Sequence, residues 1–193
     1  MIELLPSSYI DRLKVGEIFA RHAPLEVDLG CGDGSFLAAL AALHPARNFL
    51  GVERLAGRVR SACYKARSLP NVRVLRIETT YAVSYLLPPA SVSAFHFLFP
   101  DPWPKRRHHE RRVFKPDFLD ALINALAPGG LLHIATDQHD YFDEMVNLVH
   151  TRDELQVVPD PTGEFPATTF EKRFRNSGQP IYRLELRKIS PVI

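Results

Sequence analysis

Short apolar segments alternate with segments of helical periodicity along most of this 193-residue chain. Each apolar segment has the length of a buried strand and is followed by a turn and a helix-like stretch. Such units form right-handed crossovers, which place parallel strands side by side with helices on both faces. The pattern therefore predicts a single doubly wound, mostly parallel α/β sheet. The expected strands are 25–29, 48–52, 72–77, 92–99 and 131–135, and the expected helices are 35–43, 56–67, 82–87, 117–126 and 141–150.

The two ends of the chain depart from this alternation. Residues 155–158 and 181–186 are interpreted as two further strands separated by a polar loop, so we expect an antiparallel strand at the C-terminal end of the sheet. Residues 10–21 are expected to form a helix that packs on the same body. A chain of 193 residues has the size of one domain.

The composition is that of a soluble globular protein, with 46% hydrophobic and 24% charged residues. No apolar segment approaches the roughly 20 residues that span a bilayer, and the N-terminus lacks a basic segment followed by an apolar core. Cys31 and Cys63 are too few for a disulfide framework and fit a reducing compartment. We therefore expect a cytoplasmic protein that does not bind membranes.

A glycine-rich turn, Asp28-Leu-Gly30-Cys-Gly32-Asp-Gly34, follows the first expected strand. Ligands of open α/β sheets bind beyond the carboxyl ends of the strands, and glycines let the backbone approach them closely. Glu53 closes the second expected strand, where a carboxylate can accept hydrogen bonds from both hydroxyls of a ribose. A tight structural connection would explain the glycines alone, but the acid in register with them favours a nucleotide-like ligand.

The spacing of these glycines does not fit a dinucleotide. A dinucleotide site requires G-x-G-x-x-G or G-x-G-x-x-A, and Ser35 stands where the third small residue belongs. The Asp28 carboxylate would repel a pyrophosphate but suits a ligand with an amino or sulfonium cation. The pattern D-x-G-x-G-x-G is similar to the first motif of class I S-adenosylmethionine-dependent methyltransferases. We therefore expect S-adenosylmethionine, not a nicotinamide, as the cofactor, and S-adenosylhomocysteine as its product.

The fourth expected strand ends in the sequence PDPWP, which contains Asp101 and Trp103, and continues directly into a cationic cluster. Six Lys and Arg residues lie between Lys105 and Lys115. A carboxylate and an aromatic ring can hold a planar base, and clustered cations can contact phosphates. If all six did so, affinity for a nucleic acid would fall with salt on a log–log slope of about −4 to −5. The alternative is a Pro-rich surface turn followed by a solvated charged segment.

These segments together resemble one family. The glycine turn and the segment FPDPWPKRRHHERR resemble the tRNA (guanine-N7)-methyltransferases, as do ATD at 135–137 and TTFEKR at 168–173, followed by Gly178 and Ile181-Tyr182. The resemblance covers about residues 25–187. It implies a Rossmann-like class I methyltransferase fold and an enzyme of tRNA modification. The implied reaction transfers the methyl group of S-adenosylmethionine to N7 of a guanosine in the tRNA variable loop, at position 46.

The resemblance also implies which residues bind the cofactor. At the turn after the third expected strand the family presents an Asp or Asn, whereas this chain has Tyr81 there, preceded by Thr80. We expect both of these residues to contact the cofactor, with Glu78 or Thr79 as alternative sources of the polar contact. The other expected cofactor-binding residues are Asp28, Gly30, Gly32, Glu53 and Asp101.

For the tRNA substrate, the resemblance implies contacts from Lys105, Asp137, Thr168 and Glu171. Trp103 is expected to stack on the target nucleotide, although it fits an anchor of its own loop equally well. Spacing alone favours structural roles for Asp137, as the N-cap of the next helix, and for T-x-x-E at 168–171, as a capping box. His108 and His109 are adjacent and would point in different directions on a helix, so we expect no metal.

Asp101 is the expected catalytic residue. N7 of guanine carries a free lone pair at neutral pH, so its methylation requires alignment and no general base. The product base gains positive charge, which a nearby carboxylate would stabilise. Asp101 or Asp137 could also accept hydrogen bonds from the Watson–Crick edge of the guanine. Asp101 would thus act by orientation and electrostatics, and a turn-forming role is compatible with this one.

The expected partner is tRNA, bound by a monomer or a homodimer. The alternatives are a methyltransferase with another substrate, a non-catalytic RNA-binding or scaffold protein, and a nicotinamide-dependent oxidoreductase. The glycine spacing disfavours the oxidoreductase, and the intact acids Asp28, Glu53 and Asp101 disfavour the non-catalytic protein. We expect one methyltransferase domain over 1–193. Its parts are a helical segment (1–22), a cofactor-binding core (25–150) and C-terminal strands with a substrate loop (151–193).

Overall fold

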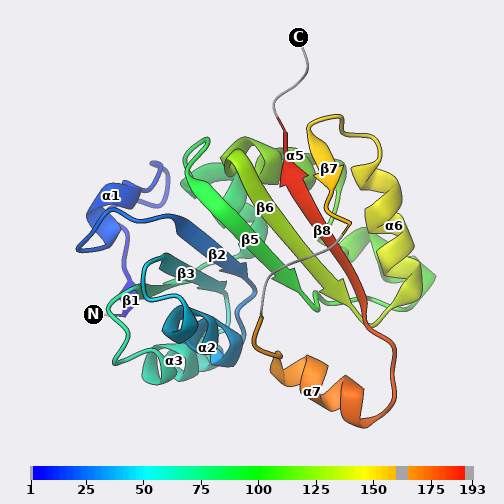
Figure 1. Ribbon diagram of the computed structural model, residues 1–193, viewed down its shortest axis with the longest axis horizontal. Coiled ribbons are helices and arrows are strands. Elements are labelled where there is room, and N and C mark those ends of the chain that lie inside the picture. Colours follow the sequence, from blue (N-terminus) through cyan, green and yellow to red (C-terminus); the bar gives the residue numbers. More distant parts are fainter. Residues whose placement is uncertain (1, 160–164, 190–193) are drawn as a thin grey trace.

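The computed structural model describes residues 2–159 and 165–189. At the centre of this part of the chain lies an eight-stranded sheet in the order β1-β4-β3-β2-β5-β6-β8-β7 (Figure 1). The strands are β1 (Glu3–Leu4), β2 (Leu25–Leu29), β3 (Asn48–Glu53), β4 (Val72–Arg76), β5 (Val92–Leu98), β6 (Leu126–Thr136), β7 (Leu155–Val157) and β8 (Tyr182–Lys188).

The strand directions confirm the expected fold class. The strands from β1 to β6 pair in parallel, β8 runs antiparallel to β6, and β7 runs antiparallel to β8. The chain builds the sheet outward from β2 through β3 to β4 and then returns to add β5 on the other side of β2. The strand order therefore reverses between β2 and β5, and in open α/β sheets ligands bind at such a reversal.

Helices cover both faces of the sheet, as the alternation predicts. Helices α2 and α3 pack on one face of the sheet, at β3 and β4. Helices η1, α5 and α6 pack on the other face of the sheet (Figure 1). The helices are α1 (Val15–Ile18), α2 (Ser35–Leu43), α3 (Ala56–Lys65), α4 (Thr79–Tyr81), the π-helix η1 (Ala82–Leu86), the 3-10 helix η2 (Arg106–Arg111), α5 (Pro116–Ala125), α6 (His139–Val149) and α7 (Thr169–Asn176).

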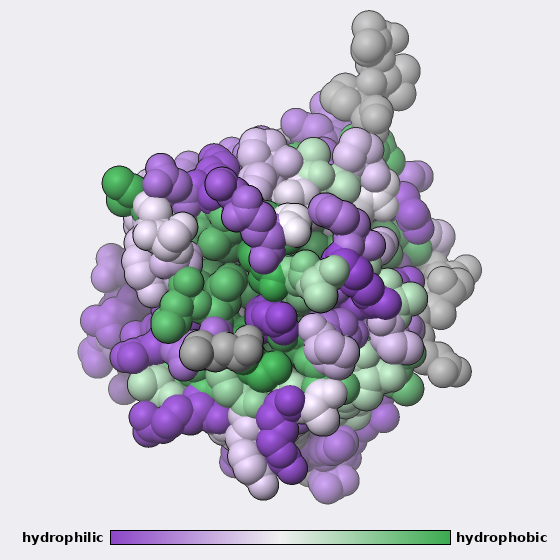
Figure 2. Space-filling view, turned by 90° about the vertical axis from the view of Figure 1, so that its left-hand side faces the viewer, coloured by the Kyte–Doolittle hydropathy of each residue, from purple (hydrophilic) through white to green (hydrophobic). Residues whose placement is uncertain are grey.

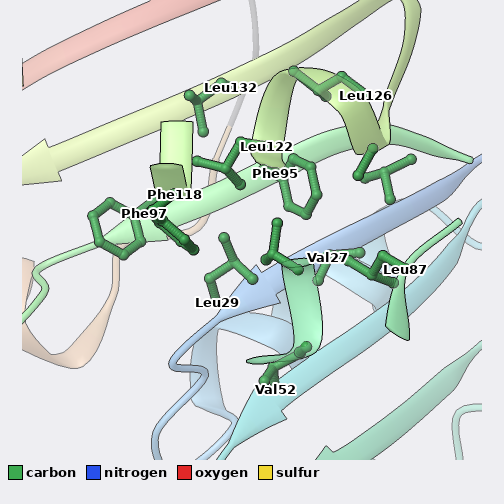
Figure 3. Packing of buried hydrophobic residues seen from close by; sticks show 14 of the residues in the cluster. Val27, Leu29, Val52, Leu87, Phe95, Phe97, Phe118, Leu122, Leu126 and Leu132 are labelled. Atoms are coloured by element: carbon green, nitrogen blue, oxygen red, sulfur yellow. The ribbon is translucent and has the colours of Figure 1, made fainter. Parts of the chain in front are cut away.

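The larger hydrophobic core lies between the sheet and η1, α5 and α6 (Figure 3). Helix α5 presents Phe118, Leu119 and Leu122 at helical spacing, and each is at most 1% exposed. They meet Phe95 and Phe97 of β5, which point to the same face of the strand. Burial of each such side chain contributes about 1.5–3 kcal/mol to folding. This packing fixes β5, and with it the turn that follows its carboxyl end.

The expected N-terminal helix over 10–21 is wrong. Only the four residues of α1 are helical, and Glu3 and Leu4 instead add β1 to the sheet beside β4. Leu13 and Phe19 are the buried hydrophobic residues in this stretch, and a spacing of six residues does not place them on one helix face. Gly16 in the interior further disfavours a long helix, by about 1 kcal/mol relative to alanine.

Two further elements differ from the expectation. Strand β6 begins at Leu126 and continues through Pro128-Gly129-Gly130, which was expected only to end the preceding helix. Its pairing with β5 is irregular between Val92 and Ala94, and this irregularity accommodates the extra residues. Helix α7 was not predicted beyond a short turn, and it lies near the carboxyl ends of β5 and β6 (Figure 1).

The side of the molecule that carries β1 and α1 has an apolar hollow with a polar rim (Figure 2). The N-terminal segment exposes large apolar side chains, with Leu5 66% and Ile10 84% exposed.

Gly34 provides a test of the packing at the start of α2. Its φ is +75°, and a Cβ there would lie 2.5 Å from Ala62 Cα on α3. We expect Gly34→Ala to lower the free energy of unfolding by about 3–4 kcal/mol, since left-handed strain adds to overpacking. Gly129 has the same φ of +75° with no neighbour within 4 Å, so Gly129→Ala should cost only about 1 kcal/mol. Urea denaturation measures both, and equal losses would contradict this explanation.

Candidate active site

A pocket of about 590 Å³ opens at the carboxyl ends of the parallel strands, where the strand order reverses. The turns after β2, β3, β4 and β5 and the start of α7 form most of its wall, and Phe36 of α2, Arg111 of η2 and Val113 complete it. Its volume suits a ligand of nucleoside size. The wall includes Asp28, Gly30, Cys31, Gly32, Glu53, Arg54, Arg58, Glu78, Thr79, Asp101, Trp103, Arg111, Thr168, Thr169 and Phe170.

Hydrogen bonds to β3, α2 and α3 hold the glycine turn after β2 in place, and the turn has open space at Gly30. The amides of Gly30 and Cys31 both donate to the Val52 carbonyl on β3, at 2.9 and 3.0 Å. The Asp33 carboxylate accepts from the Ser35 amide and from Lys65, which ties the turn to the start of α2 and to α3. A Cβ on Gly30 would meet no atom within 4 Å, so the turn leaves space for a ligand at this point.

Two buried acids lie behind this turn. Asp28 and Glu53 are each 5% exposed, on the neighbouring strands β2 and β3. Burial, and then the nearby charge of Glu53, raise the pKa of Asp28 to about 7. One oxygen of Glu53 accepts from the Leu55 amide at 2.8 Å, and the other lies 3.8 Å from an Arg58 nitrogen. This end of the pocket is therefore built to receive a cation and hydrogen-bond donors.

The turn after β4 places two residues in the pocket wall, and both are among the alternatives that the sequence offers. Glu78 and Thr79 line the pocket, whereas Thr80 and Tyr81 do not belong to its wall. The Glu78 carboxylate accepts from the amides of Thr80 and Tyr81, at 2.9 and 2.8 Å, and so caps α4. The Tyr81 hydroxyl donates to the carbonyl of Tyr9 in the N-terminal segment. Of the alternatives considered from sequence, Glu78 and Thr79 are the two that border the pocket.

The turn after β5 holds Asp101 and Trp103 at the pocket in a strained backbone. Phe99 and Trp103 have φ of +52° and +44°, in the left-handed backbone region that residues with a Cβ rarely adopt. Such strain is found where the surrounding structure fixes a functional site. Asp101 is exposed and lines the pocket together with Asp28 and Glu53. The Arg111 guanidinium lies 5.0 Å from the Trp103 ring centre, so Trp103 both anchors its loop and borders the pocket.

One of the six clustered cations is structural. Arg112 is 2% exposed, donates to the Pro102 carbonyl at 2.9 Å and pairs with Asp140 and Glu144 on α6. Its guanidinium also lies 4.6 Å from the ring centre of Tyr141. Arg112 therefore holds the loop of Asp101 against the core, which leaves at most five of the six cations for contact with phosphates.

Helix α7 completes the pocket wall. Thr168 caps the helix by accepting from the Glu171 amide at 2.9 Å, which confirms one half of the expected capping box. The Glu171 side chain does not reach back to residue 168. It is 8% exposed and accepts hydrogen bonds from Arg175 and from Arg183 on β8. Thr168 and Phe170 border the pocket, whereas Glu171 joins α7 to the sheet.

Lys105 and Asp137 lie outside the pocket wall. Lys105 is exposed and directly precedes η2. Asp137 accepts from the side chain of its neighbour Gln138 at 2.7 Å, and Gln138 occupies the N-cap position of α6. The N-cap interpretation of Asp137 is therefore wrong, and its contact with the substrate stays a prediction.

A row of buried polar side chains crosses the sheet, and it was not predicted from the sequence. His96 bonds Glu26 at 2.8 Å, stacks on His133 with 4.9 Å between ring centres, and His133 in turn lies 3.0 Å from Glu185. Phe165 packs edge-on against both rings. Burial lowers the pKa of His133 to about 3, so it is neutral at physiological pH. The register of β5, β6 and β8 could have predicted this row, because it sets His96 opposite His133 and His133 opposite Glu185.

A family model described as "Putative methyltransferase" matches residues 22–184. A tRNA (guanine-N(7)-)-methyltransferase from Leifsonia xyli subsp. xyli is 40% identical over 187 residues, with 92% of this chain and 82% of the relative covered. The enzyme of that name from Alkalilimnicola ehrlichii is 37% identical over 183 residues, with 91% and 77% covered. The chain belongs to the tRNA (guanine-N(7)-)-methyltransferase family.

Solved structures agree with the fold of this family member. The 16S rRNA methyltransferase KamB superposes with a TM-score of 0.65 at 21% identity, covering 92% of this chain and 93% of KamB. The aminoglycoside resistance methyltransferase NpmB1 gives 0.62 at 18% identity, with 91% and 92% covered. Among the described residues, no helix combines the length and apolarity needed to cross a membrane. The described part of the chain also has no group of three or more His, Cys, Asp or Glu placed to hold a metal.

The raised pKa of Asp28 predicts a pH-dependent stability. A carboxyl whose pKa is higher in the folded state stabilises the fold below its ordinary pKa of 3.8, and this contribution is lost as pH rises through about 7. The free energy of unfolding should therefore fall by about 2 kcal/mol more between pH 5 and pH 8 in the wild type than in Asp28→Asn. Urea denaturation at the two pH values tests this, with Asp117→Asn on the surface as control. Parallel profiles for wild type and Asp28→Asn would contradict it.

Proposed function

We propose that this chain transfers the methyl group of S-adenosylmethionine to N7 of a guanosine in tRNA, at position 46 of the variable loop. The observation that carries the proposal is the single pocket shared by the buried acids Asp28 and Glu53 and by Asp101 and Trp103. The tRNA-directed names of relatives at 37–40% identity support the choice of substrate. We further propose that residues 1–193 act as one methyltransferase domain and work in the cytoplasm, where the substrate is.

The residues of the pocket fit S-adenosylmethionine in charge and in shape. A buried carboxyl such as Asp28, with its pKa raised to about 7, gains a favourable partner in the amino group of a methionine. The Glu53 oxygen that does not bond the Leu55 amide can accept from ribose hydroxyls, and the open space at Gly30 can admit the part of the ligand between the ribose and the amino group. When bound there, S-adenosylmethionine supplies a methyl group on a positively charged sulfur. Glu78 and Thr79 are the proposed polar contacts to the adenine.

The protein needs to orient the guanine and to stabilise charge. The lone pair of N7 lies in the plane of the base, so the new carbon–nitrogen bond would form, with no proton lost beforehand, as the bond from the methyl carbon to sulfur breaks and S-adenosylhomocysteine leaves. Asp101, at the end of β5, is proposed to accept from the Watson–Crick edge of the base and so direct N7 inward. Its charge also stabilises the cation that develops on the purine. Phe99 and Trp103 flank Asp101 in the chain and have positive φ angles, and we propose that this backbone conformation sets the direction of Asp101.

The remaining substrate contacts stay proposals of different kinds. Thr168 borders the pocket and can reach a bound nucleotide directly. Lys105 precedes the exposed cations of η2 and is proposed to contact the backbone of the tRNA. Glu171 joins α7 to β8, so we propose that it acts on the substrate through α7, whereas the proposed substrate contact of Asp137 lies outside the pocket wall.

The site of methylation tests the function directly. The protein is incubated with unmodified tRNA and labelled S-adenosylmethionine, and the RNA is then cleaved selectively at 7-methylguanosine. We expect label at one nucleotide, position 46. Label at another atom or in another class of RNA would reject the proposed substrate, and calorimetry showing that NADH binds in place of S-adenosylmethionine would reject the cofactor.

Asp101 tests the mechanism. We expect Asp101→Ala to lower kcat by about 100-fold, as for the loss of one electrostatic contact in a preorganised site. Because no general base is involved, the pH profile of kcat for the wild type should have no rising limb that Asp101→Ala abolishes. Initial rates of tRNA methylation between pH 6 and pH 9 measure both quantities. Asp117→Ala, an exposed acid close to the cationic cluster, is the matched control, and a kcat of Asp101→Ala equal to that of the control would contradict the role.

A further inference from the structure

Helix α7 has three distinct faces, and two of them are occupied. Phe170 and Phe174 pack against Phe99 of the turn after β5, with ring centres 6.1 and 5.6 Å from it. Glu171 and Arg175, one position further round the helix, form the second face, and Glu171 is joined there to Arg183 of β8. Residues at i and i+4 share a face of a helix, so these two pairs orient the whole of α7.

The third face carries the exposed residues Lys172, Arg173 and Asn176. The only acid of the helix, Glu171, is buried and already engaged by two arginines. Within the residues that the structure describes, neither Lys172 nor Arg173 has an acidic partner in an ion pair. This face therefore presents two positive charges that the described fold does not use.

A second group of exposed cations lies on η2. Arg106 and Arg107 are exposed and, in the described part of the chain, form no ion pair. Arg111 at the end of η2 stacks on Trp103 and lines the pocket. Both cationic elements therefore border the same pocket, η2 through Arg111 and α7 through its first turn. The two are linked by the turn that carries Phe99 and Trp103.

We propose that the outer face of α7, Lys172 and Arg173, binds the phosphate backbone of the RNA strand next to the target nucleotide, jointly with Arg106 and Arg107 of η2. The inference rests on the proposed function. A nucleotide that enters the pocket keeps a phosphate on each side, and these remain outside it. Unpaired cations on flexible stems bind phosphates without reading sequence, so this surface positions the strand while the pocket selects the base.

The salt dependence of tRNA binding tests this surface. Lys172→Ala/Arg173→Ala should raise KM for tRNA by about tenfold and reduce the magnitude of the log–log salt slope by about 1.4–1.8, since each lost phosphate contact removes about 0.7–0.9. Arg106→Ala/Arg107→Ala should reduce the slope by a similar amount. The kcat at saturating tRNA and the Kd for S-adenosylmethionine should stay at wild-type values, because neither pair lines the pocket.

The control is Lys14→Ala/Arg67→Ala, which removes two exposed cations that do not border the pocket. Its slope and KM should equal those of the wild type. An unchanged salt slope of tRNA binding in Lys172→Ala/Arg173→Ala, with normal cofactor binding as evidence of folding, would overturn the proposed phosphate-binding role of this surface. If the wild type forms no 7-methylguanosine, the proposed function fails instead, so the two failures are distinguishable.

Discussion

The reversal of strand order between β2 and β5 is the constraint on which the site depends. Neighbouring parallel strands whose connections leave in opposite directions open a crevice at their carboxyl ends. The crevice brings the acid of β2 and its glycine turn next to the loop of Asp101, which is more than seventy residues away in sequence. The turns after β2 and β5 meet at this reversal, and the turns after β3 and β4 and the start of α7 complete the wall around it.

Tertiary contacts then give the crevice its rigidity. Arg112 ties the loop after β5 to α6, and Glu171 ties α7 to β8, so a buried charged group holds each of these two walls. Breaking such a buried pair leaves an uncompensated charge. The basic residues therefore have two roles: the buried Arg112 fixes the loop after β5, and the exposed cations of η2 and α7 remain available for phosphate.

Local patterns made much of the fold predictable from the sequence. The apolar strands, the glycine turn and the PDPWP segment each carry their signal within about ten residues. The failures involve contacts that no local pattern encodes. Residues 10–21 look helical until Gly16 and the spacing of Leu13 and Phe19 are weighed against packing. Arg112 looked like its neighbours because its partners lie 28 and 32 residues away, and the stacked His96 and His133 meet only once β5 and β6 are in register.

The central claim is that one crevice holds the methyl donor and the guanine in line. A crystal structure with S-adenosylhomocysteine tests it most directly. The account predicts the ribose hydroxyls on Glu53, the amino group near Asp28, and the sulfur facing the space beside Asp101 and Trp103. A ligand bound elsewhere, or one in this crevice with its sulfur closed off from Asp101, would contradict it.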